Sequence, residues 1–178
     1  MRLGVFYKSR RGGLGLMNYL SVCVGGASGA SVLEPDTYTF VKPCEDFLLQ
    51  ALDLEIPVFA SCFGFQLALQ ALGAEVLRDK DAFEMGTLPI SLTPAASLDK
   101  IFENTPNPVM AVTVHQEKVV ELPENCEVLA YTNECVHAFK VKNKPFWGFQ
   151  FHPEVDRQSL VDRLTYYKDQ YTDGDDHL

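Results

Sequence analysis

The sequence predicts an α/β domain with a central, mostly parallel sheet flanked by helices and a small antiparallel excursion. In the first half of the chain, short apolar runs alternate with helical patterns, which is typical of βαβ units. In the second half, short strand-like runs follow one another with turn residues between them. With 178 residues, of which 47% are hydrophobic, we expect a single domain over residues 1–178.

The first half is expected to contain two strands and two helices. Residues 20–24 form an apolar run that predicts a buried strand, and residues 41–54 carry apolar side chains on one helical face. The next strand is expected at residues 56–60. The strongly apolar residues 63–72 predict a second helix, which ends at Gly73 as a left-handed cap.

The second half is expected to contain strands and one closing helix. The strands are expected at residues 87–92, 109–114, 127–131, 136–141 and 146–151. Residues 159–167 predict the closing helix, and residues 172–178 predict a frayed acidic tail.

Charge and cysteine content exclude several classes of function. The 15 Lys and Arg residues against 24 Asp and Glu give a net charge of −9, which repels a polyphosphate backbone, so no nucleic acid is expected as a ligand. The sequence holds no apolar run long enough to span a membrane. Five cysteines without CxxC spacing indicate reduced thiols and argue against a structural zinc, so neither a metal nor a cofactor is expected.

The N-terminal region allows two interpretations. Lys8, Arg10 and Arg11 precede a fairly apolar stretch, which imitates a twin-arginine signal peptide. Asn18 and Ser21 interrupt that stretch, however, and residues 20–24 suit a buried strand equally well. We therefore expect a cytoplasmic protein.

The segment around Cys62 is the first that indicates chemistry. It predicts a buried strand, a sharp turn at Cys62 and then a helix. A side chain at such a turn projects at the carboxyl edge of the sheet, beside a positive helix N-terminus that favours a thiolate. Gly64 would let the helix pack closely against neighbouring strands. A buried core thiol is the alternative, but the turn favours a nucleophile.

A second segment supplies the base that a thiolate nucleophile needs. A predicted strand ends at His152, and Glu154 follows two positions later, beyond a proline. Residues i and i+2 of an extended segment project to the same side, so Glu154 could orient His152. Together with Cys62 they form a candidate Cys-His-Glu triad.

These two motifs, Ser-Cys-Phe-Gly-Phe-Gln around Cys62 and Phe-His-Pro-Glu-Val around His152, resemble the class I (triad) glutamine amidotransferases. The resemblance covers residues 20–161 and implies a flavodoxin-like sheet. It implies that Cys62 attacks the side-chain amide of glutamine, that His152 relays a proton to departing ammonia, and that Glu154 holds the imidazole.

Further site residues are implied by the same resemblance. The backbone N–H groups of Gly26 and Phe63 would donate to the tetrahedral oxyanion. Gln66 matches a position that lines the glutamine pocket. The segment that begins at Val114 and His115 resembles the one that borders the glutamine and faces the ammonia acceptor.

The sequence also departs from the family pattern. Ala60 stands where the family usually has glycine, and Phe65 where it often has histidine or methionine. Only one short strand, at residues 1–7, fits before the strand at residues 20–24, so we expect a shortened N-terminal part.

The resemblance implies glutamine as the substrate and a destination for the ammonia. A chain of this length leaves no room for a synthetase, so a synthetase partner chain or a homo-oligomer is expected. Two alternatives remain open: a hydrolase of γ-glutamyl conjugates on the same fold, and a non-catalytic glutaminase-like module that binds glutamine or a partner protein.

Overall fold

The computed structural model describes residues 5–9, 19–27, 29–79, 84–155, 158 and 161. The closing helix expected at residues 159–167, the acidic tail and most of the stretch that imitates a signal peptide lie outside these residues. Among the residues that are described, no helix combines the length and the apolar character that a membrane span requires.

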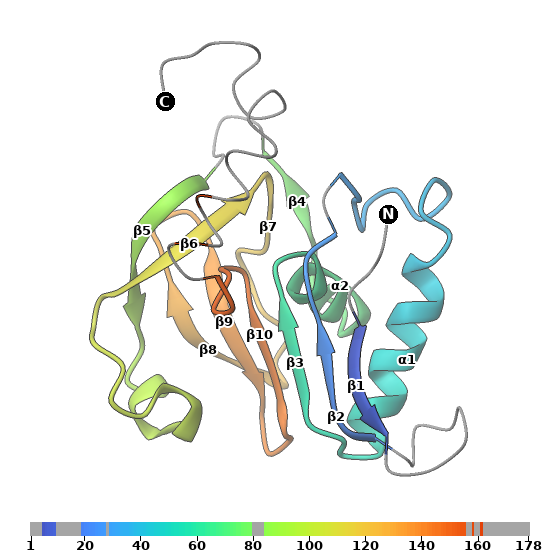
Figure 1. The fold of residues 1–178 in the computed structure, drawn as a ribbon, viewed down its shortest axis with the longest axis horizontal. Helices are drawn as coiled ribbons and strands as arrows, with labels where there is room; N and C mark the ends of the chain where they lie inside the picture. Colours follow the sequence, from blue (N-terminus) through green and yellow to red (C-terminus); the bar gives the residue numbers. More distant parts are fainter. Residues whose placement is uncertain are drawn as a thin grey trace.

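One curled sheet organises the described part of the chain, with the strand order β1-β2-β3-β10-β9-β8-β5-β6 (Figure 1). Its strands are β1 (Val5–Ser9), β2 (Tyr19–Val24), β3 (Val58–Ser61), β5 (Glu84–Leu92), β6 (Val109–His115), β8 (Cys126–Tyr131), β9 (Val136–Val141) and β10 (Phe146–Phe149). A separate two-stranded sheet pairs β4 (Leu77–Arg78) with β7 (Glu117–Lys118).

The α/β class is confirmed, and the sheet is mixed. Strand β3 pairs in parallel with β2 and with β10, whereas the other pairs of this sheet are antiparallel. The antiparallel part, expected as a small excursion, extends over β9, β8, β5 and β6. Connection length explains the difference, because the short turns between β8, β9 and β10 allow only antiparallel pairing, and parallel pairing needs a long crossover.

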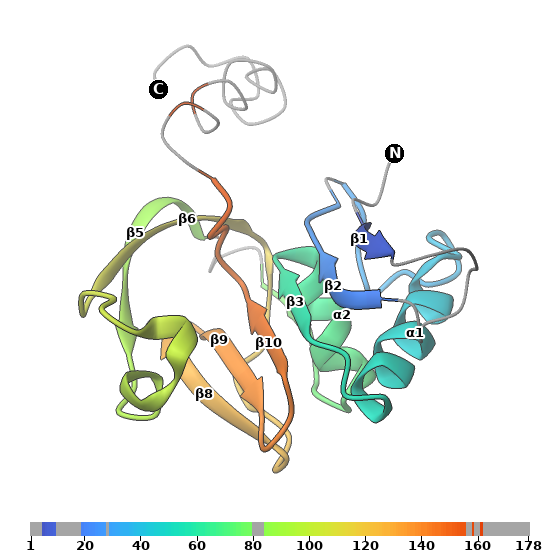
Figure 2. The ribbon, with the colours of Figure 1, turned by 60° about the horizontal axis from the view of Figure 1, so that its bottom comes forward.

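Two helices cover one face of the parallel strands (Figure 2). Helix α1 (Val41–Asp53) buries Val41, Leu48 and Ala51, which its helical period places on one side. Helix α2 (Phe63–Ala71) is buried almost throughout, which explains its continuous apolar sequence. It ends before Gly73, whose φ of +95° confirms the predicted left-handed cap.

Gly64 permits the close contact between α2 and β2 that the sequence predicts. A Cβ atom at this position would lie 2.4 Å from the carbonyl oxygen of Val24, so a larger residue would push the helix away from the strand. The first turn of α2 is therefore held against the end of β2, next to Cys62.

The antiparallel part contains a second hydrophobic cluster. Ile90, Leu129, Phe102 and Phe149 pack there, and two short 3-10 helices, η2 (Ala96–Leu98) and η3 (Lys100–Phe102), close one side of it. These short helices and the strands β4 and β7 are not predicted by the sequence, because two or three residues carry no recognisable period.

Candidate active site

Cys62 occupies a strained turn between β3 and α2. Its φ of 52° and ψ of −110° fall in a region that residues other than glycine rarely adopt. The Cys62 N–H donates to the carbonyl oxygen of Phe149 at 2.8 Å, and the Cys62 carbonyl accepts from the N–H of Gln66 at 3.2 Å. Strand β10 and the first turn of α2 thus hold the strained conformation, as in a nucleophile elbow.

Strand pairing brings His152 to the same edge of the sheet. Phe149 of β10 pairs with Ser61 of β3, so the chain beyond β10 leaves the sheet beside Cys62. The N–H of His152 donates to the carbonyl oxygen of Val112 at 2.8 Å, which fixes its backbone. Its side chain forms a hydrogen bond with Cys62.

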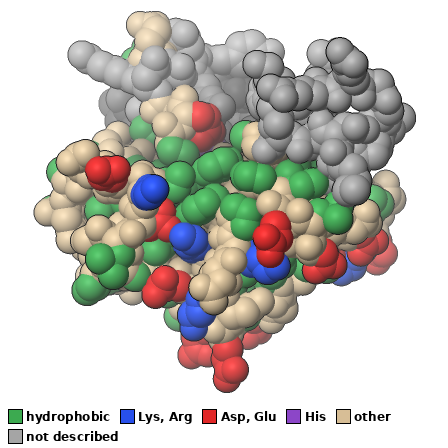
Figure 3. Space-filling model, turned by 90° about the horizontal axis from the view of Figure 1, so that it is seen from below, with side chains coloured by type: hydrophobic (Ala, Val, Ile, Leu, Met, Phe, Trp, Pro, Cys, Tyr) green, Lys and Arg blue, Asp and Glu red, His purple; other side chains and the backbone are tan. Residues whose placement is uncertain are grey.

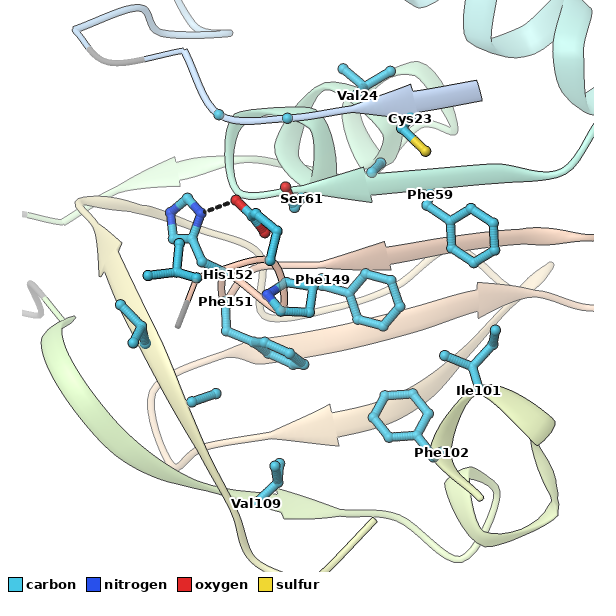
Figure 4. A pocket seen from close by; sticks show the side chains of 18 of the residues that line it. Cys23, Val24, Phe59, Ser61, Ile101, Phe102, Val109, Phe149, Phe151 and His152 are labelled. Atoms are coloured by element: carbon cyan, nitrogen blue, oxygen red, sulfur yellow. Dashed lines mark hydrogen bonds and ion pairs between the residues drawn. The ribbon is translucent and has the colours of Figure 1, made fainter. Parts of the chain in front are cut away.

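Glu154 contacts the other side of the imidazole. Its Oε1 atom lies 2.7 Å from Nδ1 of His152, the interaction drawn as a dashed line in Figure 4. The side chain of His152 is only 8% exposed, whereas that of Glu154 is 46% exposed. The structure therefore brings together the three residues that the sequence singles out as a triad, in the order carboxylate, imidazole and sulfur.

Opposing effects set the protonation of His152. Burial favours the neutral ring, but the hydrogen bonds with Cys62 and Glu154 outweigh burial and raise the pKa of His152 to about 9. The ring is thus protonated at neutral pH, and an imidazolium beside a sulfur atom stabilises a thiolate. In contrast, burial raises the pKa of Cys126 to about 11 and that of Cys135 to about 12, which disfavours their thiolates.

The two predicted oxyanion donors lie next to the nucleophile. A Cβ atom at Gly26 would lie 3.4 Å from Cε1 of His152 and 3.8 Å from Cβ of Cys62, so the loop after β2 contacts both residues. Phe63 is the first residue of α2, where a backbone N–H has no acceptor within the helix. The oxyanion role of both groups stays a prediction.

The predicted substrate residues lie on the far side of Cys62. The carbonyl oxygen of Val114 is 3.9 Å from Sγ of Cys62. Gln66 is buried, and its Nε2 donates to the carbonyl oxygen of Glu117 at 3.0 Å and to Oε1 of Gln150 at 3.3 Å. Sequence reasoning did not single out Glu117 or Gln150, although both lie within the motifs that it identified.

His115 is placed differently from a residue that touches the substrate with its ring. Its Nδ1 lies 3.0 Å from the carbonyl oxygen of Glu117, and its Nε2 lies 3.1 Å from Oε2 of Glu84. Both ring nitrogens thus face groups of the protein. His115 can shape the pocket only through its backbone and through its contact with Glu117.

A cavity of about 820 Å³ opens beside His152 and Glu154, on the sheet face opposite the two helices. Phe59, Ser61 and Phe149 line it from β3 and β10, and Phe102 closes it from the other side (Figure 4). Its walls do not include Cys62, Gln66 or Val114, so the cavity meets the triad from the imidazole side. Seen from below, hydrophobic side chains also gather in the middle of the molecular surface (Figure 3).

Comparison with known proteins identifies one family. The family model for "Glutamine amidotransferase class-I" matches residues 17–165. This match includes all three triad candidates and both predicted oxyanion donors.

The curated relatives are longer than this chain. A glutamine-hydrolysing GMP synthase of Malacoplasma penetrans is 37% identical over 113 residues, which are 63% of this chain and 21% of that enzyme. In Methanococcus vannielii, a separate subunit of a glutamine-hydrolysing GMP synthase is 39% identical over 113 residues, which are 63% of this chain and 56% of that subunit. The chain therefore spans between a fifth and three fifths of the length of these relatives.

Solved structures share the fold. A glutamine amidotransferase of Thermotoga maritima matches with a TM-score of 0.78 and 25% identity, over 88% of this chain and 65% of that one. A glutamine amidotransferase of Methylobacillus flagellatus matches with a TM-score of 0.73 and 18% identity, over 93% of this chain and 64% of that one.

Proposed function

This chain belongs to the class I glutamine amidotransferase family, and we propose that it hydrolyses the side-chain amide of glutamine to glutamate and ammonia. The observation that carries the proposal is the hydrogen-bonded series of Cys62, His152 and Glu154 at the strained turn after β3. The two hydrogen bonds of His152 outweigh its burial and provide the protonated acid that the departure of ammonia requires.

The proposed reaction has two halves. In the first, the sulfur of Cys62 attacks the amide carbon, and His152 gives its proton to the nitrogen as the carbon–nitrogen bond breaks and ammonia leaves. A γ-glutamyl thioester on Cys62 remains. In the second half, His152, now neutral, accepts a proton from water as the water oxygen attacks the thioester, and the thiolate departs with release of glutamate.

The backbone on either side of Cys62 is proposed to bind the reacting carbonyl group. The N–H groups of Gly26 and Phe63 would donate to the oxyanion of each tetrahedral intermediate, which is where negative charge develops. Gln66, Val114 and His115 are proposed to border the glutamine. Gln66 and His115 would act by holding the backbone of Glu117 in place.

We further propose that the ammonia passes to a synthetase on another chain or to an acceptor in a homo-oligomer. Relatives carry the name GMP synthase, and two of the matches from methanogens are named as separate subunits. The apolar cavity beside His152 lies where the leaving nitrogen receives its proton. A second chain that covers this cavity would receive the ammonia before bulk water does.

The experiment is a glutaminase assay with intermediate trapping. The native chain should release glutamate from glutamine, and hydroxylamine should divert the thioester to γ-glutamyl hydroxamate. Cys62→Ser should abolish both products, whereas Cys126→Ser, which changes a buried cysteine outside the triad, should retain them.

Alternative substrates separate the remaining hypotheses. Faster turnover of a γ-glutamyl anilide than of glutamine would favour a conjugate hydrolase. Absence of turnover with both substrates, in the isolated chain and with a GMP synthetase partner chain added, would contradict the proposed activity and favour a binding module.

A further inference from the structure

Four side chains outside the triad converge in a buried cluster. Glu84 begins β5, His115 ends β6, and Cys135 and His137 lie at the start of β9. One ligand atom from each lies within 4.8 Å of every other, and all four positions are enclosed. The side chain of His137 is 0% exposed and that of His115 is 1% exposed.

The pairing of β5 with β6 creates the core of the cluster. Glu84 is the partner of His115 in the antiparallel register, so their side chains lie on the same face of the sheet. Oε2 of Glu84 lies 2.8 Å from Nε2 of His137, 3.1 Å from Nε2 of His115 and 3.5 Å from Sγ of Cys135. A single carboxylate oxygen thus faces three other potential ligand atoms.

The tautomer of His115 points its free electron pair into this cluster. A carbonyl oxygen only accepts hydrogen bonds, so Nδ1 of His115 must carry the hydrogen that faces the carbonyl of Glu117. In the neutral ring, Nε2 is then unprotonated. No hydrogen bond of acceptable geometry reaches Nε2 from the described residues, although Oε2 of Glu84 is 3.1 Å away.

Metal-binding histidines commonly show this arrangement. One ring nitrogen donates to a backbone carbonyl or a carboxylate, which orients the ring and leaves the other nitrogen for the metal. The contact between His115 and the carbonyl of Glu117 supplies that outer hydrogen bond. A cation between Nε2 of His115 and Oε2 of Glu84 would satisfy two electron pairs that otherwise face each other.

We propose that Glu84, His115, Cys135 and His137 bind one zinc ion. A tetrahedral zinc with bonds of about 2.0–2.3 Å holds its ligand atoms about 3.3–3.8 Å apart, and the cluster needs only small movements to reach that spacing. Two imidazoles, one thiolate and one carboxylate suit zinc far better than magnesium or calcium, which prefer oxygen ligands. Four protein ligands leave no open position, so this zinc is structural.

The charges of the cluster agree with a cation. Burial opposes ionisation of Glu84, but hydrogen bonds from His115 and His137 outweigh it and hold the pKa of this carboxyl group well below its usual range. Glu84 is therefore negative at neutral pH. Zinc binding would release the proton of Cys135, because the metal coordinates the thiolate.

The position of the site gives the zinc a consequence for the neighbouring pocket. His115 follows Val114, whose carbonyl oxygen lies beside the sulfur of Cys62. A metal that ties the end of β6 to β5 and β9 would fix this backbone. The zinc proposal depends only on the cluster, and it stands or falls independently of the proposed glutaminase activity.

Cobalt substitution provides a direct test in the purified full chain. Bound Co²⁺ should produce a sulfur-to-cobalt charge-transfer band and the visible bands of a tetrahedral ion, at one equivalent per chain. Zn²⁺ added afterwards should displace Co²⁺ and remove these bands. Cys135→Ser should abolish the charge-transfer band and weaken Zn²⁺ binding more than about 100-fold, since loss of an outer-shell partner alone costs about 10- to 100-fold.

Two cysteine variants serve as matched controls. Cys126 is as buried as Cys135 but lies outside the cluster, so Cys126→Ser should keep the band. Cys62→Ser should also keep it, which excludes binding at the triad. If Cys135→Ser does not fold, His137→Gln tests the same site, with loss of the tetrahedral bands expected.

Two results would overturn the zinc site. One is that neither Zn²⁺ nor Co²⁺ binds to the native chain at micromolar concentration, which would identify the cluster as a buried ion-pair network with a protonated histidine. The other is a charge-transfer band that persists in Cys135→Ser and disappears in Cys62→Ser.

Discussion

Replacing Glu154 by glutamine would remove the negative charge beside His152 and keep the size of the side chain. Oε1 of Glu154 lies 2.7 Å from Nδ1 of His152, but Glu154 is 46% exposed, so solvent screens part of the interaction. A hydrogen bond to a charged group contributes about 1.5–3 kcal/mol, and the exposure of Glu154 favours the lower part, about 1.5–2 kcal/mol. We therefore expect kcat/KM for glutamine to fall about 10- to 30-fold at neutral pH.

The same substitution should change the pH dependence of the rate. In the native chain the pKa of His152 is about 9, so the acid that protonates the leaving nitrogen is lost as the pH rises through that value. Loss of the Glu154 charge removes one of the effects that raise this pKa and leaves burial, which lowers it. The alkaline limb of the rate profile should thus move to lower pH in Glu154→Gln.

The assay is the initial rate of glutamate formation between about pH 6 and 10 for the native chain and two variants. Glu55→Gln is the control, because Glu55 also forms an ion pair, with Lys144 at 2.8 Å, but lies before the start of β3, at the end opposite Cys62. An alkaline limb that is unchanged in Glu154→Gln, or equally shifted in Glu55→Gln, would refute the role of Glu154.

Three further predictions address the nucleophile, the packing of α2 and the stability of the fold. A diazo-ketone analogue of glutamine should alkylate Cys62 and spare Cys126, whose pKa burial raises to about 11; peptide mass mapping checks this. Gly64→Ala should lower the free energy of unfolding by about 1–3 kcal/mol in denaturant titrations, because its Cβ would lie 2.4 Å from the oxygen of Val24. The raised pKa of His152 stabilises the folded state fully below its ordinary value of 6.5, and this contribution is lost as the pH rises through about 9. The native chain should therefore lose about 3 kcal/mol over that interval relative to His152→Gln, and parallel stability curves would contradict this.

The elements with strong local signals are those that the sequence predicts most accurately. Helix α2 begins directly after Cys62 and ends just before Gly73, as expected, because a sharp turn and a left-handed cap mark its two ends. The triad is equally accessible, since each of its two motifs is a short continuous segment. Its third requirement, that the two segments meet, follows from the parallel pairing of β3 with β10.

Features that depend on pairing between distant strands are not visible in the sequence. Glu84 and His137 are 53 positions apart and show no metal-binding spacing, yet the order β9-β8-β5-β6 places them in contact. The antiparallel share of the sheet is underestimated for the same reason, because alternation along the chain does not reveal which strands become neighbours. His115 illustrates the limit for a single residue: its motif predicts a place near glutamine but not the direction of its ring.

The geometry of the triad depends on one strand pair more than on any single catalytic side chain. The N–H of Cys62 donates to the carbonyl oxygen of Phe149, so the elbow is bonded to the strand that leads to His152. One residue earlier, Gly148 pairs with Ala60, and a Cβ atom at Gly148 would lie 2.2 Å from the ring of Phe139. The core on β9 therefore fixes the height of β10 in the sheet, and β10 fixes the distance between the sulfur and the imidazole. Because backbone hydrogen bonds and core packing hold this distance, the strain at Cys62 is balanced by the sheet rather than by the residues that react.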